Sequence, residues 1–320
     1  MSSKTKIWLI ISTSLVVIGL IMFVAAMFAC DWDFSKLSSG NYETTTYVLN
    51  EEFDNISINT DTADILFATS EDETCKVVCY EHESIKYSAK VKNNTLTIDV
   101  IDNRKWYEYI GIYFDTAKIT VYLPKTDYTS LFVEESTGNV EIPKGFKFED
   151  VDISLSTGDV NFFASATKLI KIKASTGNIF CKNISAGGLD LSVSTGKVTV
   201  SNATCDGNVA IKGSTGKTNL TDTVCQNIIS NSDTGDIVLK NVIAVEKFSI
   251  KRSTGDVRFD GSDAAEIFVE TDTGDVTGTL LSEKIFITKT DTGNVDVPKT
   301  TAGGKCEINT DTGDINLKID

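Results

Sequence analysis

The tetrapeptide Ser253-Thr254-Gly255-Asp256 is one of ten near-identical copies along this chain. In every copy threonine precedes the glycine, and serine or aspartate precedes the threonine. The ten glycines follow one another at intervals of 19 or 20 residues: Gly138, Gly158, Gly177, Gly196, Gly216, Gly235, Gly255, Gly274, Gly293 and Gly313. So regular a period is typical of a repeat protein whose successive units stack on one another.

Apolar residues alternate with polar residues on both sides of each glycine. With the glycine as position zero, positions −7, −5, +2 and +4 are apolar in 36 of 40 cases, whereas position −4 is never apolar. A period of two residues indicates a β-strand with one buried face. Each repeat therefore contains two strands.

The glycine itself is expected to form a corner. The inward positions are odd before it and even after it, so a continuous strand would turn one set outward, and the chain must bend. Glycine adopts positive φ without steric cost, as such a turn requires. Serine or aspartate at −2 can hydrogen-bond the backbone of its own turn.

These features predict an all-β fold, a single-stranded β-solenoid with 19 or 20 residues per coil. Ten coils about 4.8 Å apart would span about 48 Å. A third apolar position between +7 and +10 is expected to close each coil, as at Phe148, Ile184, Val224, Val245 and Leu281.

The N-terminus predicts one transmembrane helix ahead of the solenoid. Residues 7–30 are uncharged and long enough to cross a bilayer, with Lys4 and Lys6 before them and Asp31 after them. By the positive-inside rule, residues 1–6 are cytoplasmic and the rest is extracytoplasmic, which predicts a single-pass protein of the cell membrane. A cleaved secretion signal is the alternative interpretation, and lipidation of Cys30 is another.

The region between the anchor and the regular repeats divides into two parts. Residues 31–50 are polar and predict a stalk. Residues 51–130 predict irregular coils, because 56–67 and 110–121 repeat the coil pattern with Ala63 and Ala117 in place of glycine. Between them, Asn93-Asn94 predicts a coil turned by asparagine, which tolerates positive φ. Residues 131–320 predict the regular repeats.

Charge and composition exclude several classes of function. The formal net charge is −15, and residues 1–30 carry only two lysines, so residues 31–320 carry −15 − 2 = −17. A surface this acidic argues against a nucleic-acid partner. His82 is the only histidine, so we expect no serine, cysteine or lysine nucleophile to have a histidine partner within reach. We place His82 on a polar strand face.

The triplet Asp-Thr-Gly also occurs in aspartic proteases, and here it begins at Asp233, Asp272, Asp291 and Asp311. Those enzymes need two aspartates that share one proton. In this chain the triplet alternates with Ser-Thr-Gly in the same register and is one spelling of a turn. We predict that the chain is not an enzyme and binds no cofactor.

The chain has seven cysteines, an odd number that does not fit a dense disulfide framework. Cys205 and Cys225 both occupy position +9 of successive coils. Stacking would bring them close, either as a disulfide or as two free thiols.

Aspartates at the turns form the strongest candidate metal site, a ladder of Asp272, Asp275, Asp291, Asp311 and Asp314. Like charges about 4.8 Å apart repel by roughly 0.9 kcal/mol in water. Calcium could relieve this repulsion through oxygen ligands. We predict instead that each aspartate accepts a hydrogen bond within its own turn and that no metal binds, with calcium as the alternative.

Aromatic residues cluster between two strands at Trp106, Tyr107, Tyr109 and Tyr113. They are expected to cap the open end of the solenoid core. If exposed, they could instead stack on sugar rings or on a partner surface.

With these residues laid out, the chain resembles the bacterial putative-adhesin β-strand-repeat family, a domain of unknown function typified by LiaG-like membrane-anchored proteins. The resemblance is carried by the N-terminal anchor, by Ile56-Ser57-Ile58, by Leu96-Thr97-Ile98, by the strand that ends at Pro124, and by the Thr-Gly repeats. It implies a surface-exposed β-solenoid, suggests adhesion from architecture alone, and transfers no functional residues.

Two functions remain open from the sequence. The first is a non-enzymatic, adhesin-like binding module that meets a protein or glycan ligand on a solenoid face. The second is an accessory protein of a cell-envelope stress or signalling system that acts through its membrane span. The sequence does not determine the oligomeric state.

Overall fold

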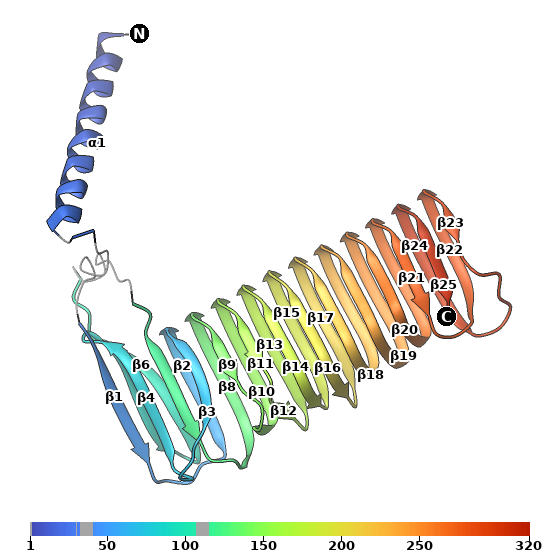
Figure 1. Cartoon of the computed structure of the whole chain (residues 1–320), viewed down its shortest axis with the longest axis horizontal. Coiled ribbons are helices and arrows are strands. Elements are labelled where there is room, and N and C mark those ends of the chain that lie inside the picture. Colours follow the sequence, from blue (N-terminus) through green and yellow to red (C-terminus); the bar gives the residue numbers. More distant parts are fainter. Residues whose placement is uncertain (1, 30, 33–40, 107–114) are drawn as a thin grey trace.

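The computed structural model describes residues 2–29, 31–32, 41–106 and 115–320. It consists of one helix, α1 (Ser3–Ala29), followed by a long stack of β coils (Figure 1). Helix α1 is long and apolar enough to cross a membrane, and apart from the buried Met27 its large apolar side chains are exposed. The predicted helix and β-solenoid are therefore confirmed, while Cys30 lies outside the described residues.

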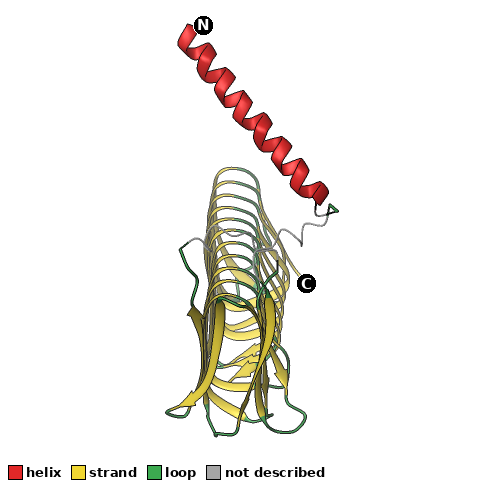
Figure 2. Ribbon diagram, turned by 90° about the vertical axis from the view of Figure 1, so that its left-hand side faces the viewer, coloured by secondary structure: helices red, strands yellow, loops and turns green. Residues whose placement is uncertain are grey.

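Each coil contributes one strand to each of two faces, and Figure 2 looks along the stack. The strands that lead to a turn form the first face: β2 (Asn55–Thr62), β8 (Asp127–Thr137), β10 (Lys147–Thr157), β13 (Leu169–Thr176), β15 (Gly188–Thr195), β17 (Asn208–Thr215), β22 (Lys284–Thr292) and β24 (Gly304–Thr312). The strands that follow a turn form the second face: β3 (Asp64–Thr69), β9 (Val140–Ile142), β11 (Val160–Phe162), β14 (Ile179–Ala186), β16 (Val198–Cys205), β21 (Val276–Leu280), β23 (Val295–Asp296) and β25 (Ile315–Ile319).

Three long strands contribute to both faces: β18 (Thr218–Thr234), β19 (Ile237–Thr254) and β20 (Val257–Thr273). The short strand β12 (Ser165–Ala166) pairs with β10. Equivalent residues of successive coils pair in parallel, so that Val133, Ile153, Ile172 and Leu191 form one column. Parallel stacking of this kind buries one apolar side chain per coil in each column.

The core belongs to the β domain alone. Its buried apolar cluster runs from Phe53 to Leu317 and includes no residue of α1. Residues 41–320 therefore have a core of their own and are expected to fold without the helix.

The glycine corners occur as predicted. All ten glycines have φ between 129° and 155°. A Cβ at any of them would lie 1.7–2.3 Å from the carbonyl oxygen of the turn residue in an adjacent coil. Glycine is thus required twice, for its backbone conformation and for the close approach of neighbouring coils.

A second corner, at position +6, escaped the sequence analysis. Asn183, Asn202, Asp222 and Asn241 occupy it with φ of 48–56°. In these four coils the corner reverses the alternation, so positions +7 and +9 point inward there. Phe148 and Ile184 are buried as expected, but the prediction was wrong for Val224, Val245 and Leu281, which are 46%, 62% and 47% exposed.

The N-terminal end is closed by antiparallel strands rather than by coils. Strand β1 (Tyr42–Leu49) pairs with β4 (Cys75–His82), β4 pairs with β7 (Lys118–Leu123), and β5 (Ile85–Lys92) pairs with β6 (Thr95–Asp102). Strand β1 falls in the second half of the predicted stalk, residues 31–50, so this part of the chain is an edge strand and not a stalk. Its alternation of exposed and half-buried residues suits the edge of a sheet. Asn93 and Asn94 have positive φ as expected, but they turn the β5–β6 hairpin and not a coil.

The coils do not follow one another in chain order at either end. Strands β2 and β3 lie between β6 and β7 on one side and β8 and β9 on the other. At the other end, β24 pairs with both β20 and β22, and β25 pairs with both β21 and β23. Residues 304–319 are thus inserted into the stack, and the coil of residues 284–297 forms its end.

Candidate functional site

The acidic turn residues form a ladder of hydrogen bonds between coils. Asp256 Oδ1 accepts a hydrogen bond from the Asp275 N–H at 2.9 Å, and Asp275 Oδ1 accepts one from the Asp314 N–H at 2.8 Å. Asp314 Oδ1 in turn accepts one from the Asn294 N–H at 2.7 Å. The acceptor role is the expected one, but each bond joins neighbouring coils instead of closing a single turn, because stacking aligns position +1 of every coil.

The aspartates at position −2 lie in a different environment from those at position +1. Asp272, Asp291 and Asp311 are exposed, and Asp291 Oδ1 lies 2.9 Å from Lys289 Nζ. Among the described residues, no group of three histidine, cysteine or acidic side chains is placed to hold a metal ion. The expectation that no metal binds, with calcium at these aspartates as the alternative, stays a prediction from the sequence.

The first face carries a continuous polar ladder at position −4. In spatial order its central members are Ser154, Lys173, Ser192, Lys212, Asn231, Lys251 and Glu270, each paired with the next across adjacent strands. All are exposed or half-buried. We call this row the face ladder, and it offers a flat, regularly spaced set of hydrogen-bonding groups.

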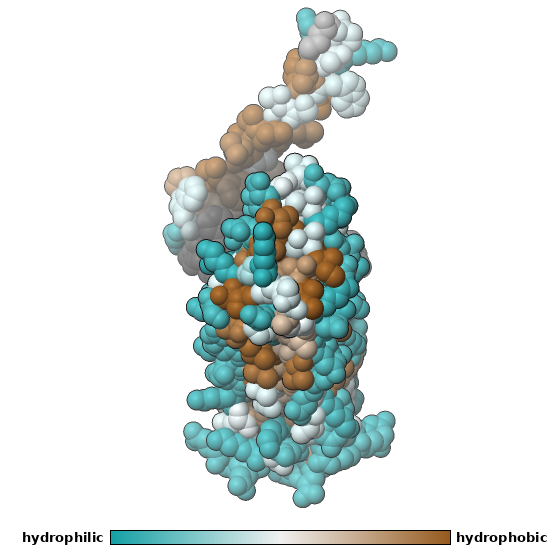
Figure 3. Space-filling view, turned by 90° about the vertical axis from the view of Figure 1, so that its right-hand side faces the viewer, coloured by the Kyte–Doolittle hydropathy of each residue, from teal (hydrophilic) through white to brown (hydrophobic). Residues whose placement is uncertain are grey.

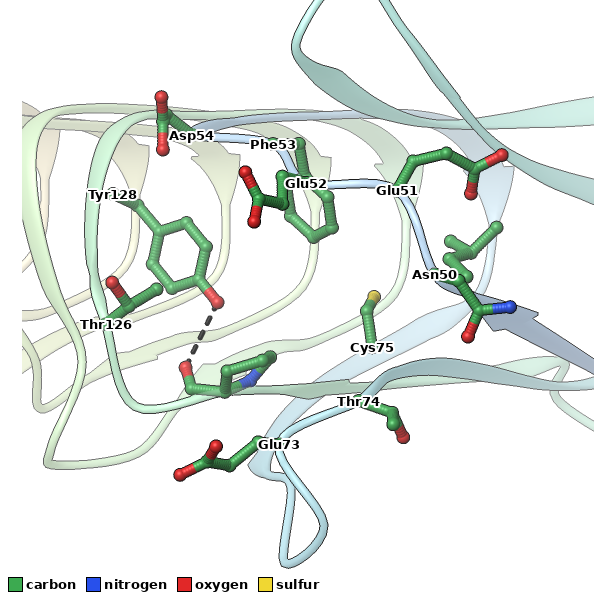
Figure 4. A pocket seen from close by; sticks show the side chains of 12 residues that line it. Asn50, Glu51, Glu52, Phe53, Asp54, Glu73, Thr74, Cys75, Thr126 and Tyr128 are labelled. Carbon is green, nitrogen blue, oxygen red and sulfur yellow. Dashed lines mark hydrogen bonds between the residues drawn. The ribbon is translucent and has the colours of Figure 1, made fainter.

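A pocket of about 450 Å³ lies at the N-terminal third, between the β1–β2 segment, the start of β4 and the β7–β8 loop (Figure 4). Phe53 and Tyr128 stack with ring centroids 6.1 Å apart, and the Tyr128 hydroxyl donates to the Pro124 carbonyl at 3.0 Å. Carboxylates of Glu51, Glu52, Asp54 and Glu73 surround this apolar floor. Three segments that are distant in the sequence build the pocket, so the sequence alone does not predict it.

His82 does not occupy the position predicted for it. It is 4% exposed, not on a polar face, and its ring centroid lies 5.4 Å from that of Tyr42. Its Nδ1 accepts a hydrogen bond from the Ser84 N–H at 3.1 Å, so this nitrogen is not available as a general base. Trp106 is 79% exposed and does not cap the core, while Tyr107, Tyr109 and Tyr113 lie outside the described residues.

Several polar side chains are buried inside the coils, which the sequence analysis also missed. Glu135 and Arg252 occupy position −3, which has the same inward parity as −5 and −7. Burial lowers the pKa of Arg252 to about 10, and its guanidinium donates to Ser230 Oγ at 2.8 Å. Lys284 is 2% exposed, and its Nζ lies 2.6 Å from Asp263 Oδ1. The inward parity of −3 was the signal that could have revealed the first two.

The cysteines of the described residues are buried free thiols, including Cys205 and Cys225. Burial raises the pKa of each of these two thiols to about 12, so neither forms appreciable thiolate near neutral pH. We expect a maleimide reagent at pH 8 to leave residues 41–320 unlabelled until denaturant unfolds them, as measured by intact mass. Rapid labelling of the folded protein would contradict the buried position.

The sequence of this chain matches the model of a known protein family. A family model described as Toastrack DUF4097 matches residues 53–223 and again residues 204–320. No curated protein matches the sequence.

Two solved structures illustrate the likeness. One, described as a putative lipid binding protein from Parabacteroides distasonis, is 20% identical, has a TM-score of 0.50 and covers 75% of this chain and 98% of its own. Another, described as a putative adhesin from Bacteroides fragilis, is 18% identical with a TM-score of 0.43 and the same coverages. The likeness to the first of these structures, at 20% identity, shows the fold alone and does not transfer a ligand. Since the family model spans most of the β domain, the chain belongs to the Toastrack DUF4097 family.

Proposed function

We propose that this chain is a non-enzymatic, adhesin-like binding module that residues 7–30 hold in the lipid bilayer, with the solenoid outside the cell. The exposed apolar surface of α1 supports the anchor. The independent core of the β domain supports a rigid rod that projects from it. The ladders of the solenoid, and not a catalytic centre, supply its recognition surface.

The observation that carries this proposal is the face ladder. Lys173, Lys212 and Lys251 lie on alternate coils, which places them about 9.6 Å apart along the rod. Ser192 and Asn231 lie between them as neutral hydrogen-bonding groups. Residues 31–320 carry a net charge of −17, and against this background the row of lysines is suited to an extended glycan or protein strand that carries negative charges.

We expect residues 41–320 to co-sediment with bacterial cell-wall fragments, and the triple variant K173S/K212S/K251S to bind about tenfold more weakly. This estimate assumes about 0.5 kcal/mol for each exposed charge contact. The matched control, K182S/K240S/K318S, removes the same charge from exposed positions on the second face. Equal loss in both variants would show that net charge matters and the face ladder does not.

The same experiment bears on the alternative function. An accessory of an envelope-stress system needs no ligand on the solenoid but must contact a membrane partner. Failure to bind wall fragments or cells, together with photo-crosslinking of residues 7–30 to a second membrane protein, would favour that role.

A further inference from the structure

The stack ends in two strand edges that no other described strand covers, and the Thr300 hydroxyl donates to the Lys284 carbonyl at the start of the first edge. Strand β22 pairs only with β24, and β23 pairs with β25, so the outer edges of the 284–297 coil lack a partner strand among the described residues. An open edge presents free N–H and C=O groups and is a template for pairing with another strand. Strand β1, which follows α1 in the chain, lies at the opposite end of the rod (Figure 1).

The same end exposes part of the apolar interior. Phe286, Val295, Val297 and Pro298 line a hollow of about 540 Å³. Figure 3 faces this end and shows apolar side chains gathered on it. Phe286, Val295 and Val297 occupy positions −7, +2 and +4, and in the other coils the residues at these positions are buried, apart from Gly278. Here a further β layer would be needed to bury them.

The outward side chains of β22 add to the apolar edge. Ile285 and Ile287 are 44% and 50% exposed at positions −8 and −6. The inserted neighbouring coil has Lys305 and Glu307 at the same two positions. Natural edge strands are usually protected from association by charges, whereas this one carries two isoleucines.

The charges flanking these isoleucines select one partner geometry. In an antiparallel pairing of β22 with a second β22 about a two-fold axis at Phe286, Ile285 lies opposite Ile287 of the other copy. Glu283 then lies opposite Lys289 of the other copy, and both contacts occur twice because the interface is isologous. Moving the axis to residue 287 would place Glu283 opposite Asp291 and Ile285 opposite Lys289. Only the first of these registers is complementary in both charge and apolar character.

We propose that two copies of this chain associate end to end through the outer edges of β22 and β23, with the two-fold axis at Phe286. The apolar hollows of the two copies then face each other, and the two solenoids form one continuous stack. Within its own strand, Lys289 contacts Asp291. In the dimer, Lys289 contacts Glu283 of the second copy, either in place of Asp291 or in addition to it. The two anchors lie at the far ends, so the dimer joins two membranes; this last step rests on the proposed function, while the dimer itself does not.

The first test is the mass of residues 41–320 by sedimentation equilibrium over a range of concentrations. We expect a monomer–dimer equilibrium with a dissociation constant on the order of 10 µM. Ile287→Lys should abolish the dimer without affecting the fold, since the side chain is half exposed on the outer face. The matched control is Ile229→Lys, at position −6 of an internal coil and 43% exposed, which should dimerise like the wild type.

Charge exchange tests the register. Glu283→Lys and Lys289→Glu should each weaken self-association about tenfold or more, because both copies then present like charges. An equimolar mixture of the two variants should regain wild-type affinity, since each contact in the mixed dimer again joins opposite charges. A strict monomer at all concentrations, or a dimer insensitive to Ile287→Lys, would overturn the proposal.

Vesicles that carry the full chain test the membrane arrangement. Wild-type vesicles should cluster and Ile287→Lys vesicles should not. Wall binding without dimers would overturn this inference and leave the proposed function standing. Dimers without wall binding would overturn the proposed function and leave this inference standing.

Discussion

Gly216→Val is expected to lower the free energy of unfolding of residues 41–320 by about 3 kcal/mol or more. Gly216 has φ of 140°, where a β-branched residue is strained. Its Cβ would also lie 1.7 Å from the Gly196 carbonyl oxygen, which is backbone and cannot swing aside. Relief would require two coils to separate and break the hydrogen bonds between them. Urea unfolding followed by circular dichroism measures the effect.

Two further variants locate the cause of this loss. Gly216→Ala should be nearly as harmful, because the first side-chain atom already makes the clash. Lys217→Asp changes the adjacent exposed residue, removes its 2.7 Å ion pair with Asp236 and places a second carboxylate near that residue. Because exposed pairs contribute little, this change should cost less than about 1 kcal/mol. If none of the three variants lowered the free energy of unfolding, the corner at Gly216 would not be a close contact between coils.

The second large effect is a dependence of stability on pH through Glu135. This carboxyl group is buried between the coil of β2 and that of β8, where it bonds with the Thr60 hydroxyl and accepts from the Ala63 N–H at 3.2 Å. Burial raises its pKa to about 7 from 4.5, and the nearby Asp61 carboxylate adds to the rise.

The direction of this pH dependence follows from the protonation of Glu135 in the folded and unfolded states. Between pH 4.5 and 7 the folded state keeps the Glu135 proton and the unfolded state loses it, so raising the pH favours unfolding. The contribution of this group to the free energy of unfolding should fall by about 3 kcal/mol across that range and stay low above it. Urea unfolding at a series of pH values measures the fall.

Glu135→Gln provides the control, because a neutral amide can keep both hydrogen bonds. The variant should match the wild type near pH 4.5 and exceed its stability by about 3 kcal/mol at pH 8. The difference between the two proteins cancels the titration of the many surface carboxylates. Parallel pH curves would show that Glu135 is ionised at neutral pH in the folded protein.

The two corners of a coil differ in how clearly the sequence marks them. The glycine corner was predictable, since a fixed Thr-Gly pair and a change of parity mark it in every repeat. The corner at +6 was not recognised, because Asn183, Asp222 and Gly261 are different residues that share one backbone conformation. Missing it placed Val224 and Val245 inside the coil when they are outside.

The candidate sites were predicted less completely than the fold. The −4 column could be read as polar and outward from the alternation alone. The pocket at Phe53 and Tyr128 could not, because its walls come from segments about 75 residues apart that only folding brings together. Buried Glu135 and Lys284 were overlooked for a related reason, since a charged residue reads as exposed until its neighbours are known.

The sequence by itself determined the repeat length, the glycine turns, the inward columns and the apolar anchor. These are local properties, fixed by the alternation of side chains and by the backbone freedom of glycine. The tertiary structure alone decided the order of the coils, with residues 304–319 inserted before the end coil and residues 55–69 inserted near the start. Coils with the same columns can stack in any order, so loop lengths and contacts between coils select the arrangement. That selection leaves the 284–297 coil at the end of the rod.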